Sequence, residues 1–145
     1  MKKLLLLAFC LSTTFPLFAW EKEVLISTAN TSLLLSAPNK GELKFIYYGD
    51  KIKPEQIGSI MEASLPDTRS AYPVFGVECT AEAALQVQHG DGNMSLDLVV
   101  TGVQTKEEPE FSLTQITTCD KVYPFEVKMM YKAYRNSDII ETWTE

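Results

Sequence analysis

The stretch VYPFEVKMMYKAYRNSDIIETWTE, residues 122–145, has the pattern of a β-hairpin. A two-residue loop at Asn136-Ser137 aligns two strands so that opposite charges meet, and apolar residues also meet. The predicted cross-strand pairs are Arg135 with Asp138, Lys132 with Glu141, Lys128 with Glu145, Met130 with Trp143, Tyr134 with Ile139, Ala133 with Ile140, Tyr131 with Thr142 and Met129 with Thr144. Because a slip by one residue would break both sets of pairs, the sequence predicts this register.

Short apolar segments separated by turn residues continue this pattern back to Val24, which is typical of a β-sandwich. The other predicted strands are residues 24–27, 32–36, 42–48, 84–89, 94–101 and 111–118. Asp91-Gly92 favours a type I′ turn within ALQVQHGDGNMSLDLVV, residues 84–100. The hairpin expected there pairs His89 with Met94, Val87 with Leu96 and Leu85 with Leu98.

Two regions depart from the strand pattern. Pro54 can occupy a first helical position, and Ile57, Ile60 and Met61 follow at helical spacing, which predicts a short helix near residues 54–63. Residues 65–80 form a long loop that we expect to do more than connect its neighbours. The predicted fold is therefore all-β, an antiparallel sandwich of the supersandwich kind with at most this one helix.

Residues 1–19 have the three parts of a secretory signal, with Lys2 and Lys3 before an apolar run and Ala19 at the cleavage site. The run is shorter than the roughly 20 residues that span a bilayer. Phe9 is too large for the residue before a lipoprotein cysteine, Cys10. We expect one domain at residues 20–145, secreted or periplasmic through a bacterial-type signal, with no membrane association after cleavage.

The chain is acidic, with 19 Asp and Glu against 13 Lys and Arg. This balance argues against nucleic acid as a partner, because a phosphate backbone attracts basic surfaces. Cys79 and Cys119 are the cysteines left after signal cleavage. An oxidising compartment would allow a disulfide between them, and two free thiols are the alternative, which we favour slightly.

The sequence carries no recognisable catalytic constellation. His89 is the only histidine, and its place at a strand end beside Asp91 favours a structural role over a place in a Ser-His-Asp triad. Paired histidines, clustered cysteines and a glycine-rich phosphate loop are all lacking, so we expect no metal or other cofactor. Candidates for a sugar platform are Trp143, Tyr131, Tyr134, Tyr72, Tyr123 and Phe125, although core or cross-strand packing explains most of them better.

Five stretches of the chain resemble, in order and spacing, the N-terminal domain of the family 36 glycoside hydrolases, the α-galactosidases. They are ISTANTSLLLS from Ile26, GELKFIYYGDKI from Gly41, YPVFG from Tyr72, ALQVQHGDGNMSLDL from Ala84, and VYPFEVKMMYKAY leading into IIETWTE. The resemblance implies a β-sandwich ahead of a (β/α)8 barrel, in which two aspartates hydrolyse terminal α-galactosides with retention. Both aspartates belong to the barrel, so the resemblance places no catalytic residue in this chain.

The resemblance also implies a contact between the loop at residues 65–80 and the substrate pocket, since in tetrameric members the N-terminal domain of a neighbouring subunit reaches the active site. The family tends to have a Gly-Asp pair after its Tyr-Pro-x-x-Gly stretch, whereas this chain has Gly76-Val77-Glu78-Cys79. The candidates for substrate contact are Asp67, Arg69, Tyr72 and Glu78, with ordinary loop residues as the alternative. The partners implied are a downstream catalytic barrel of the same protein and an α-galactoside, and a homo-oligomer is compatible with them.

The final strand predicts how the chain relates to its whole protein. Residues 139–145 reach the end of the sequence with no closing turn, so we expect a domain that is incomplete at its C-terminus, the front piece of a secreted α-galactosidase. The alternative is a free-standing secreted sandwich that binds carbohydrate or protein. A free-standing domain would cover or cap such an edge strand, which disfavours that alternative.

Overall fold

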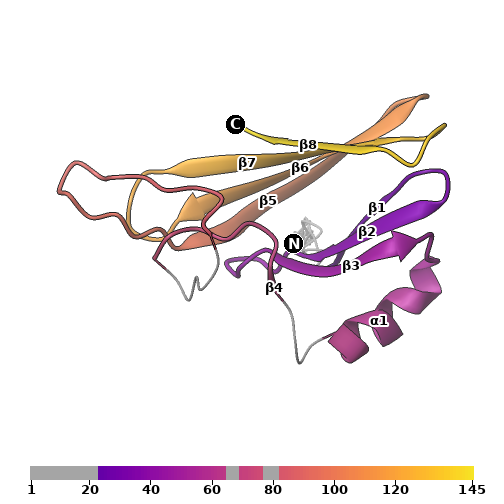
Figure 1. Ribbon diagram of the computed structural model, residues 1–145, viewed down its shortest axis with the longest axis horizontal. Coiled ribbons are helices and arrows are strands. Elements are labelled where there is room, and N and C mark those ends of the chain that lie inside the picture. The colour runs from indigo at the N-terminus through magenta and orange to yellow at the C-terminus, as the bar shows by residue number, and fades with distance from the viewer. Residues whose placement is uncertain (1–22, 65–68, 77–81) are drawn as a thin grey trace, which may run out of the picture.

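The computed structural model describes residues 23–64, 69–76 and 82–145, so the predicted signal at residues 1–19 lies outside the described part. Two four-stranded antiparallel sheets lie one over the other, and a helix lies on the outer side of the first sheet (Figure 1). The predicted β-sandwich with one short helix is confirmed. Among the described residues, no helix is long and apolar enough to cross a membrane.

Each sheet is a simple meander in which neighbours along the chain are also neighbours in space. The first sheet consists of β1 (Glu23–Ser27), β2 (Thr31–Ser36), β3 (Lys44–Asp50) and β4 (Arg69–Ser70). Between β3 and β4 lie a 3-10 turn, η1 (Pro54–Gln56), and the helix α1 (Ile57–Ser64). The second sheet consists of β5 (Leu98–Glu107), β6 (Phe111–Asp120), β7 (Glu126–Tyr134) and β8 (Ile140–Thr144).

The terminal hairpin has the predicted register. Lys132 lies opposite Glu141 and Met130 opposite Trp143, and the pairs on the other face are also as predicted. One predicted charge pair is wrong, because Arg135 instead pairs with the Glu107 carboxylate. The carboxylate of Asp138 accepts three hydrogen bonds from the β1–β2 turn, which draws it away from Arg135.

The strand pairing predicted for the hairpin at residues 84–100 is wrong. The chain reverses at Gly90-Asp91-Gly92, but the predicted type I′ turn is wrong, because Gly92 has a positive φ and Asp91 does not. The His89 N–H donates to the Asn93 carbonyl at 2.8 Å, so that Asn93 takes the place predicted for Met94. The segment 73–76 lies between the arms, since the Phe75 N–H donates to the Leu85 carbonyl and the Phe75 carbonyl accepts from the Leu96 N–H. A neighbouring segment has therefore taken the hydrogen bonds that would have joined the two arms.

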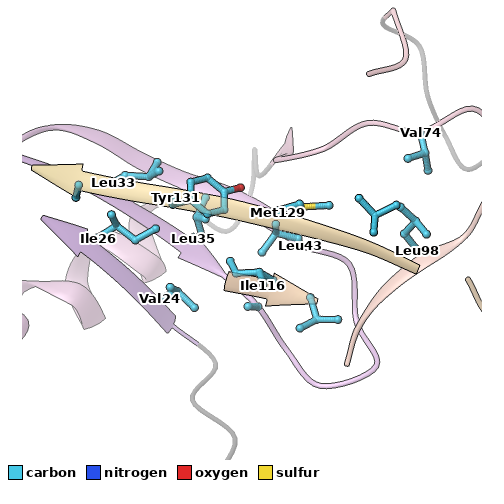
Figure 2. Packing of buried hydrophobic residues seen from close by; sticks show 14 of the residues in the cluster. Val24, Ile26, Leu33, Leu35, Leu43, Val74, Leu98, Ile116, Met129 and Tyr131 are labelled. Atoms are coloured by element: carbon cyan, nitrogen blue, oxygen red, sulfur yellow. The ribbon is translucent and has the colours of Figure 1, made fainter. Parts of the chain in front are cut away.

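The main core fills the space between the sheets (Figure 2). Alternate residues of each strand point inward, as the period of two requires. The inward-facing members include Val24, Ile26, Leu33, Leu35, Leu98, Val100, Ile116, Val127, Met129, Tyr131 and Ala133. Leu96 is only 1% exposed and joins this core although it belongs to no strand. Leu85 and Val87 pack against the same cluster, so the predicted apolar face of residues 84–98 is inward despite the missing ladder.

A second, smaller core lies between the first sheet and α1. It consists of Leu34, Ile46, Ile52 and Met61. β2 therefore buries both of its faces, which accounts for its uninterrupted run of leucines. The predicted helix near residues 54–63 is confirmed. Pro54 begins the 3-10 turn, and the Gln56 side chain accepts a hydrogen bond from the Lys53 N–H at 2.8 Å.

Candidate functional site

The structure describes two of the four candidate substrate contacts. Arg69 lies in β4 opposite Phe45, is exposed, and makes no ion pair with any described residue. Tyr72 is half-buried and packs against the main core. Asp67 and Glu78 lie outside the described residues. Tyr72 therefore has a packing role, and the substrate contacts stay a prediction.

A cluster of polar and aromatic side chains lies at the loop end of the molecule, where residues 84–97 meet the β6–β7 connection (Figure 1, left). We call its members, His89, Asp91, Asn93, Tyr123 and Phe125, the loop-end cluster. The His89 and Tyr123 rings stack with centroids 3.5 Å apart and planes 9° apart. The Tyr123 hydroxyl donates to Asp91 Oδ2 at 2.7 Å and accepts from Asn93 Nδ2 at 2.9 Å. Phe125 meets His89 edge-on, with centroids 6.4 Å apart.

Two aspartates shape the backbone that carries the loop-end cluster. Asp91 Oδ1 accepts from the Asn93 N–H at 2.9 Å, which closes the tight turn, and Gly92 supplies its positive φ of 86°. Asp120 Oδ1 accepts from the Val122 and Tyr123 N–H groups, each at 2.8 Å. The other oxygen of Asp120 accepts from the Asp97 N–H at 2.7 Å. Asp120 therefore joins the two loops and holds the backbone at Tyr123.

The electrostatics of the loop-end cluster favour ionised carboxylates. The Asn93 N–H and the Tyr123 hydroxyl hold the pKa of Asp91 below its usual value. Burial raises the pKa of Asp120, but the N–H groups of Asp97, Tyr123 and Val122 together lower it further. A general acid in glycoside hydrolysis needs a raised pKa. Neither aspartate has the environment of such an acid.

His89 has a partner in the loop itself. Its Nε2 lies 3.2 Å from the Ser95 carbonyl oxygen, so the ring donates there and helps to close the loop. Of the aromatic residues predicted as a sugar platform, Tyr123 and Phe125 contact His89, whereas Tyr131 belongs to the main core and Tyr72 packs against it. In the described part of the chain, no group of three or more His, Cys, Asp or Glu residues could hold a metal ion.

The contacts that build the loop-end cluster were not predicted from the sequence. Tyr123 lies 32 residues from Asp91 and 30 from Asn93, and no local pattern links positions so far apart. The Asx pattern of Asp91-Gly92-Asn93 was the available signal for the turn, but it does not specify the aromatic ring that covers it.

The preference for two free thiols over a disulfide between Cys79 and Cys119 stays a prediction. Cys119 has a free, half-buried thiol on β6, which lies 3.8 Å from Glu126 Oε2. Cys79 lies outside the described residues.

Comparison with solved structures shows which proteins share this fold. AgaA A355E, a family 36 α-galactosidase from Geobacillus stearothermophilus, superposes with a TM-score of 0.71 at 19% identity, over 85% of this chain and 21% of that chain. AgaB from the same organism gives 0.70 at 21% identity, with the same two coverages. The α-galactosidase from Lactobacillus brevis gives 0.69 at 17% identity, over 84% of this chain and 21% of that chain. This chain thus spans about a fifth of the length of these enzymes.

The sequence itself matches a family description. No curated protein matches the sequence of this chain. The match is to the glycosyl hydrolase family 36 N-terminal domain and covers residues 41–145, from the β2–β3 connection through β8. Since that range is more than half of the chain, and the fold agrees with that of family 36 α-galactosidases, this protein belongs to the glycosyl hydrolase family 36 N-terminal domain family.

Proposed function

We propose that this chain is the non-catalytic N-terminal domain of a secreted α-galactosidase that hydrolyses terminal α-galactosides with retention. The observation that carries the proposal is the family match over residues 41–145 in a chain that spans 21% of the similar enzymes. In homologues this domain precedes the catalytic domain. The proposal therefore assigns catalysis to polypeptide outside residues 1–145.

The proposed mechanism uses two carboxylates of the catalytic domain in different roles. One attacks the anomeric carbon, and the other protonates the leaving oxygen; in retaining enzymes these two carboxyl groups lie about 5 Å apart. Asp91 and Asp120 are unsuited to the second role, because backbone N–H groups lower the pKa of each. The lowered pKa values therefore argue against Asp91 and Asp120 as the general acid.

Within this chain, the proposed substrate contacts are Asp67, Arg69, Tyr72 and Glu78. Arg69 has the most favourable placement, because its exposed guanidinium has five N–H donors and no ion-pair partner among the described residues. In the whole enzyme, Arg69→Ala should raise KM for an α-galactoside several-fold with little change in kcat. Lys53→Ala, which removes an exposed cation beside α1, is the matched control. An unchanged KM in the Arg69→Ala variant would show that Arg69 does not contact the substrate.

Secretion is tested by the N-terminus of the mature protein. Intact-mass analysis of the protein from the culture medium or periplasm should give a chain that begins at Trp20. Recovery from the cytoplasm with residues 1–19 still attached would contradict secretion.

The coding sequence downstream of Glu145 tests the assignment of catalysis. The proposal requires several hundred further codons with the alternating strand and helix pattern of a (β/α)8 barrel. A stop codon at this point would instead favour a free-standing binding module.

A further inference from the structure

The loop-end cluster contains an Asp-Gly sequence, Asp91-Gly92, in an exposed turn. In such a sequence the amide nitrogen of the glycine can attack the carboxyl carbon of the aspartate, because no side chain shields that nitrogen. The N–Cγ bond forms, a Cγ–O bond breaks, and the departing oxygen leaves as water with the amide proton. Hydrolysis of the resulting succinimide at Cγ restores aspartate, whereas hydrolysis at the α-carbonyl gives isoaspartate.

The surroundings of the Asp91-Gly92 bond are open. A Cβ built on Gly92 meets no described atom within 4 Å, and the Asp91 side chain is exposed, so water reaches both groups. Sterically, therefore, the turn permits both the ring closure and the hydrolysis.

Hydrogen bonds nevertheless engage both reacting groups. Asp91 Oδ1 accepts from the Asn93 N–H at 2.9 Å, and Oδ2 accepts from the Tyr123 hydroxyl at 2.7 Å. The Gly92 N–H, which must lose its proton in the attack, donates to the His89 carbonyl at 2.9 Å. The carboxylate is thus bound beyond Gly92, and the attacking N–H has a different partner.

The same contacts keep the carboxyl group in its unreactive form. Ring closure needs a neutral carboxyl group, because a carboxylate would have to expel oxide. The Asn93 N–H and then the Tyr123 hydroxyl hold the pKa of Asp91 below its usual value, which reduces the neutral fraction. Of these two donors, only the Tyr123 hydroxyl comes from outside the turn, and Asp120 holds the backbone of Tyr123 in place.

We propose that Asp91-Gly92 is a site of isoaspartate formation that the Tyr123 hydroxyl protects while the two loops are joined. When Tyr123 moves away, the Asp91 carboxyl group can turn toward the Gly92 nitrogen and take up a proton, and ring closure follows. Isoaspartate routes the main chain through Cβ, which adds one atom to the turn and moves the carboxylate away from the Asn93 N–H. The inference concerns a covalent modification and goes beyond the proposed enzymatic role.

The test incubates the full chain in mildly acidic ¹⁸O-labelled water, because each ring closure followed by hydrolysis adds one oxygen from water at Asp91. Tryptic digestion in ordinary water then releases residues 70–106, and electron-transfer fragmentation of this peptide distinguishes isoaspartate from aspartate. Tyr123→Phe retains the ring that stacks on His89 and removes only the hydroxyl. Loss of this hydrogen bond should raise the rates of ¹⁸O uptake and isoaspartate formation roughly two- to tenfold.

Tyr134→Phe is the matched control, because it also removes a phenolic hydroxyl that donates to an exposed carboxylate, that of Glu141. It should react at the native rate. The native chain unfolded in urea is the upper reference, and the folded native chain should react more slowly than this reference. Amide exchange at Leu96 shows whether each variant is folded.

Equal rates in Tyr123→Phe and the native chain would overturn the proposal. An equal reaction rate in the folded and the urea-unfolded native chain would also overturn it, because the fold would then give no protection. An equal rise in Tyr134→Phe and Tyr123→Phe would do the same, because it would trace the reaction to a general loss of stability.

Discussion

The β7–β8 hairpin and the segment 84–98 both consist of two apolar-patterned arms around a strong turn, yet only the first forms a ladder. In β7–β8, one register places Lys132 opposite Glu141 and Met130 opposite Trp143, and the ladder has that register. In 84–98, the segment 73–76 lies between the arms and bonds to both Leu85 and Leu96. The difference shows that turn chemistry determines where a chain reverses, whereas competition from neighbouring segments determines whether the arms pair.

The largest expected effect concerns Leu96, which lies in the second arm of the segment 84–98. It tests whether burial of the Leu96 side chain holds this arm against the main core although the arms form no ladder. Leu96→Ala should lower the free energy of unfolding by about 2–5 kcal/mol, because the side chain is 1% exposed and its removal leaves a cavity. Met94→Ala, two residues away at a side chain that is 41% exposed, is the matched control and should cost less than about 0.5 kcal/mol. Urea unfolding measures both. Equal losses would show that residues 94–96 are not anchored through Leu96.

The next effect tests the segment that separates the arms. Gly76 has a φ of +124°, and a Cβ built there lies 2.7 Å from Ser95 Cα. Gly76→Ala should therefore cost about 1–3 kcal/mol through backbone strain and should weaken the Phe75–Leu96 hydrogen bond. The control is Gly90→Ala, where the added Cβ meets nothing within 4 Å.

Gly76→Ala and Gly90→Ala are compared by urea unfolding, with amide exchange at Leu96 as the local probe. If Gly76→Ala unfolds at the same urea concentration as Gly90→Ala, and Leu96 exchanges no faster, the segment 73–76 does not hold the arms apart.

The smallest effect concerns the attachment of the β7–β8 turn to the first sheet. Hydrogen bonds from the Asn30 side chain and N–H, and then from the Thr28 hydroxyl, hold the pKa of Asp138 below 3.8. A carboxylate whose pKa is lower in the folded state than in the unfolded state stabilises the fold at pH values above its unfolded-state pKa. This stabilisation disappears as the pH falls through the folded-state pKa. The Tm advantage of the native chain over Asp138→Asn should therefore shrink as pH falls below 3.8.

The pH dependence of Asp138 is measured by thermal melts from neutral to acid pH. Asp50→Asn, at the exposed end of β3, removes a carboxylate with no side-chain partner among the described residues and is the control. A Tm difference between native chain and Asp138→Asn that stays constant to the lowest pH would show that the carboxylate is not bound as described.

Local patterns were sufficient to predict much of the fold. Pro54 with the spacing of Ile57, Ile60 and Met61 gave the helix, and the charge pairs around Asn136-Ser137 gave the β7–β8 register. β5 continues to Glu107, well past its predicted end at Thr101. Its second half is polar and has no strong apolar alternation, so its strand conformation depends on the ladder with β6.

The candidate site could be predicted less well, because its contacts join distant segments. Tyr123 covers the turn at Asp91 from the β6–β7 connection, and Asp138 bonds to Asn30 across 108 residues. The prediction that Arg135 pairs with Asp138 rested on the sequence of the hairpin alone. Arg135 and Asp138 each found partners on other elements, namely Glu107 and the β1–β2 turn.

The central claim is that catalysis lies outside this chain, and hydrolysis of a chromogenic α-galactoside tests it most directly. The purified chain from Trp20 to Glu145 should give no turnover above a mock preparation, because the proposed function assigns both carboxylates of the retaining mechanism to a barrel outside these residues. The polypeptide that includes the downstream region should be active, and should lose that activity when either barrel aspartate is replaced. Turnover by residues 20–145 alone, abolished by a substitution within them, would contradict the account.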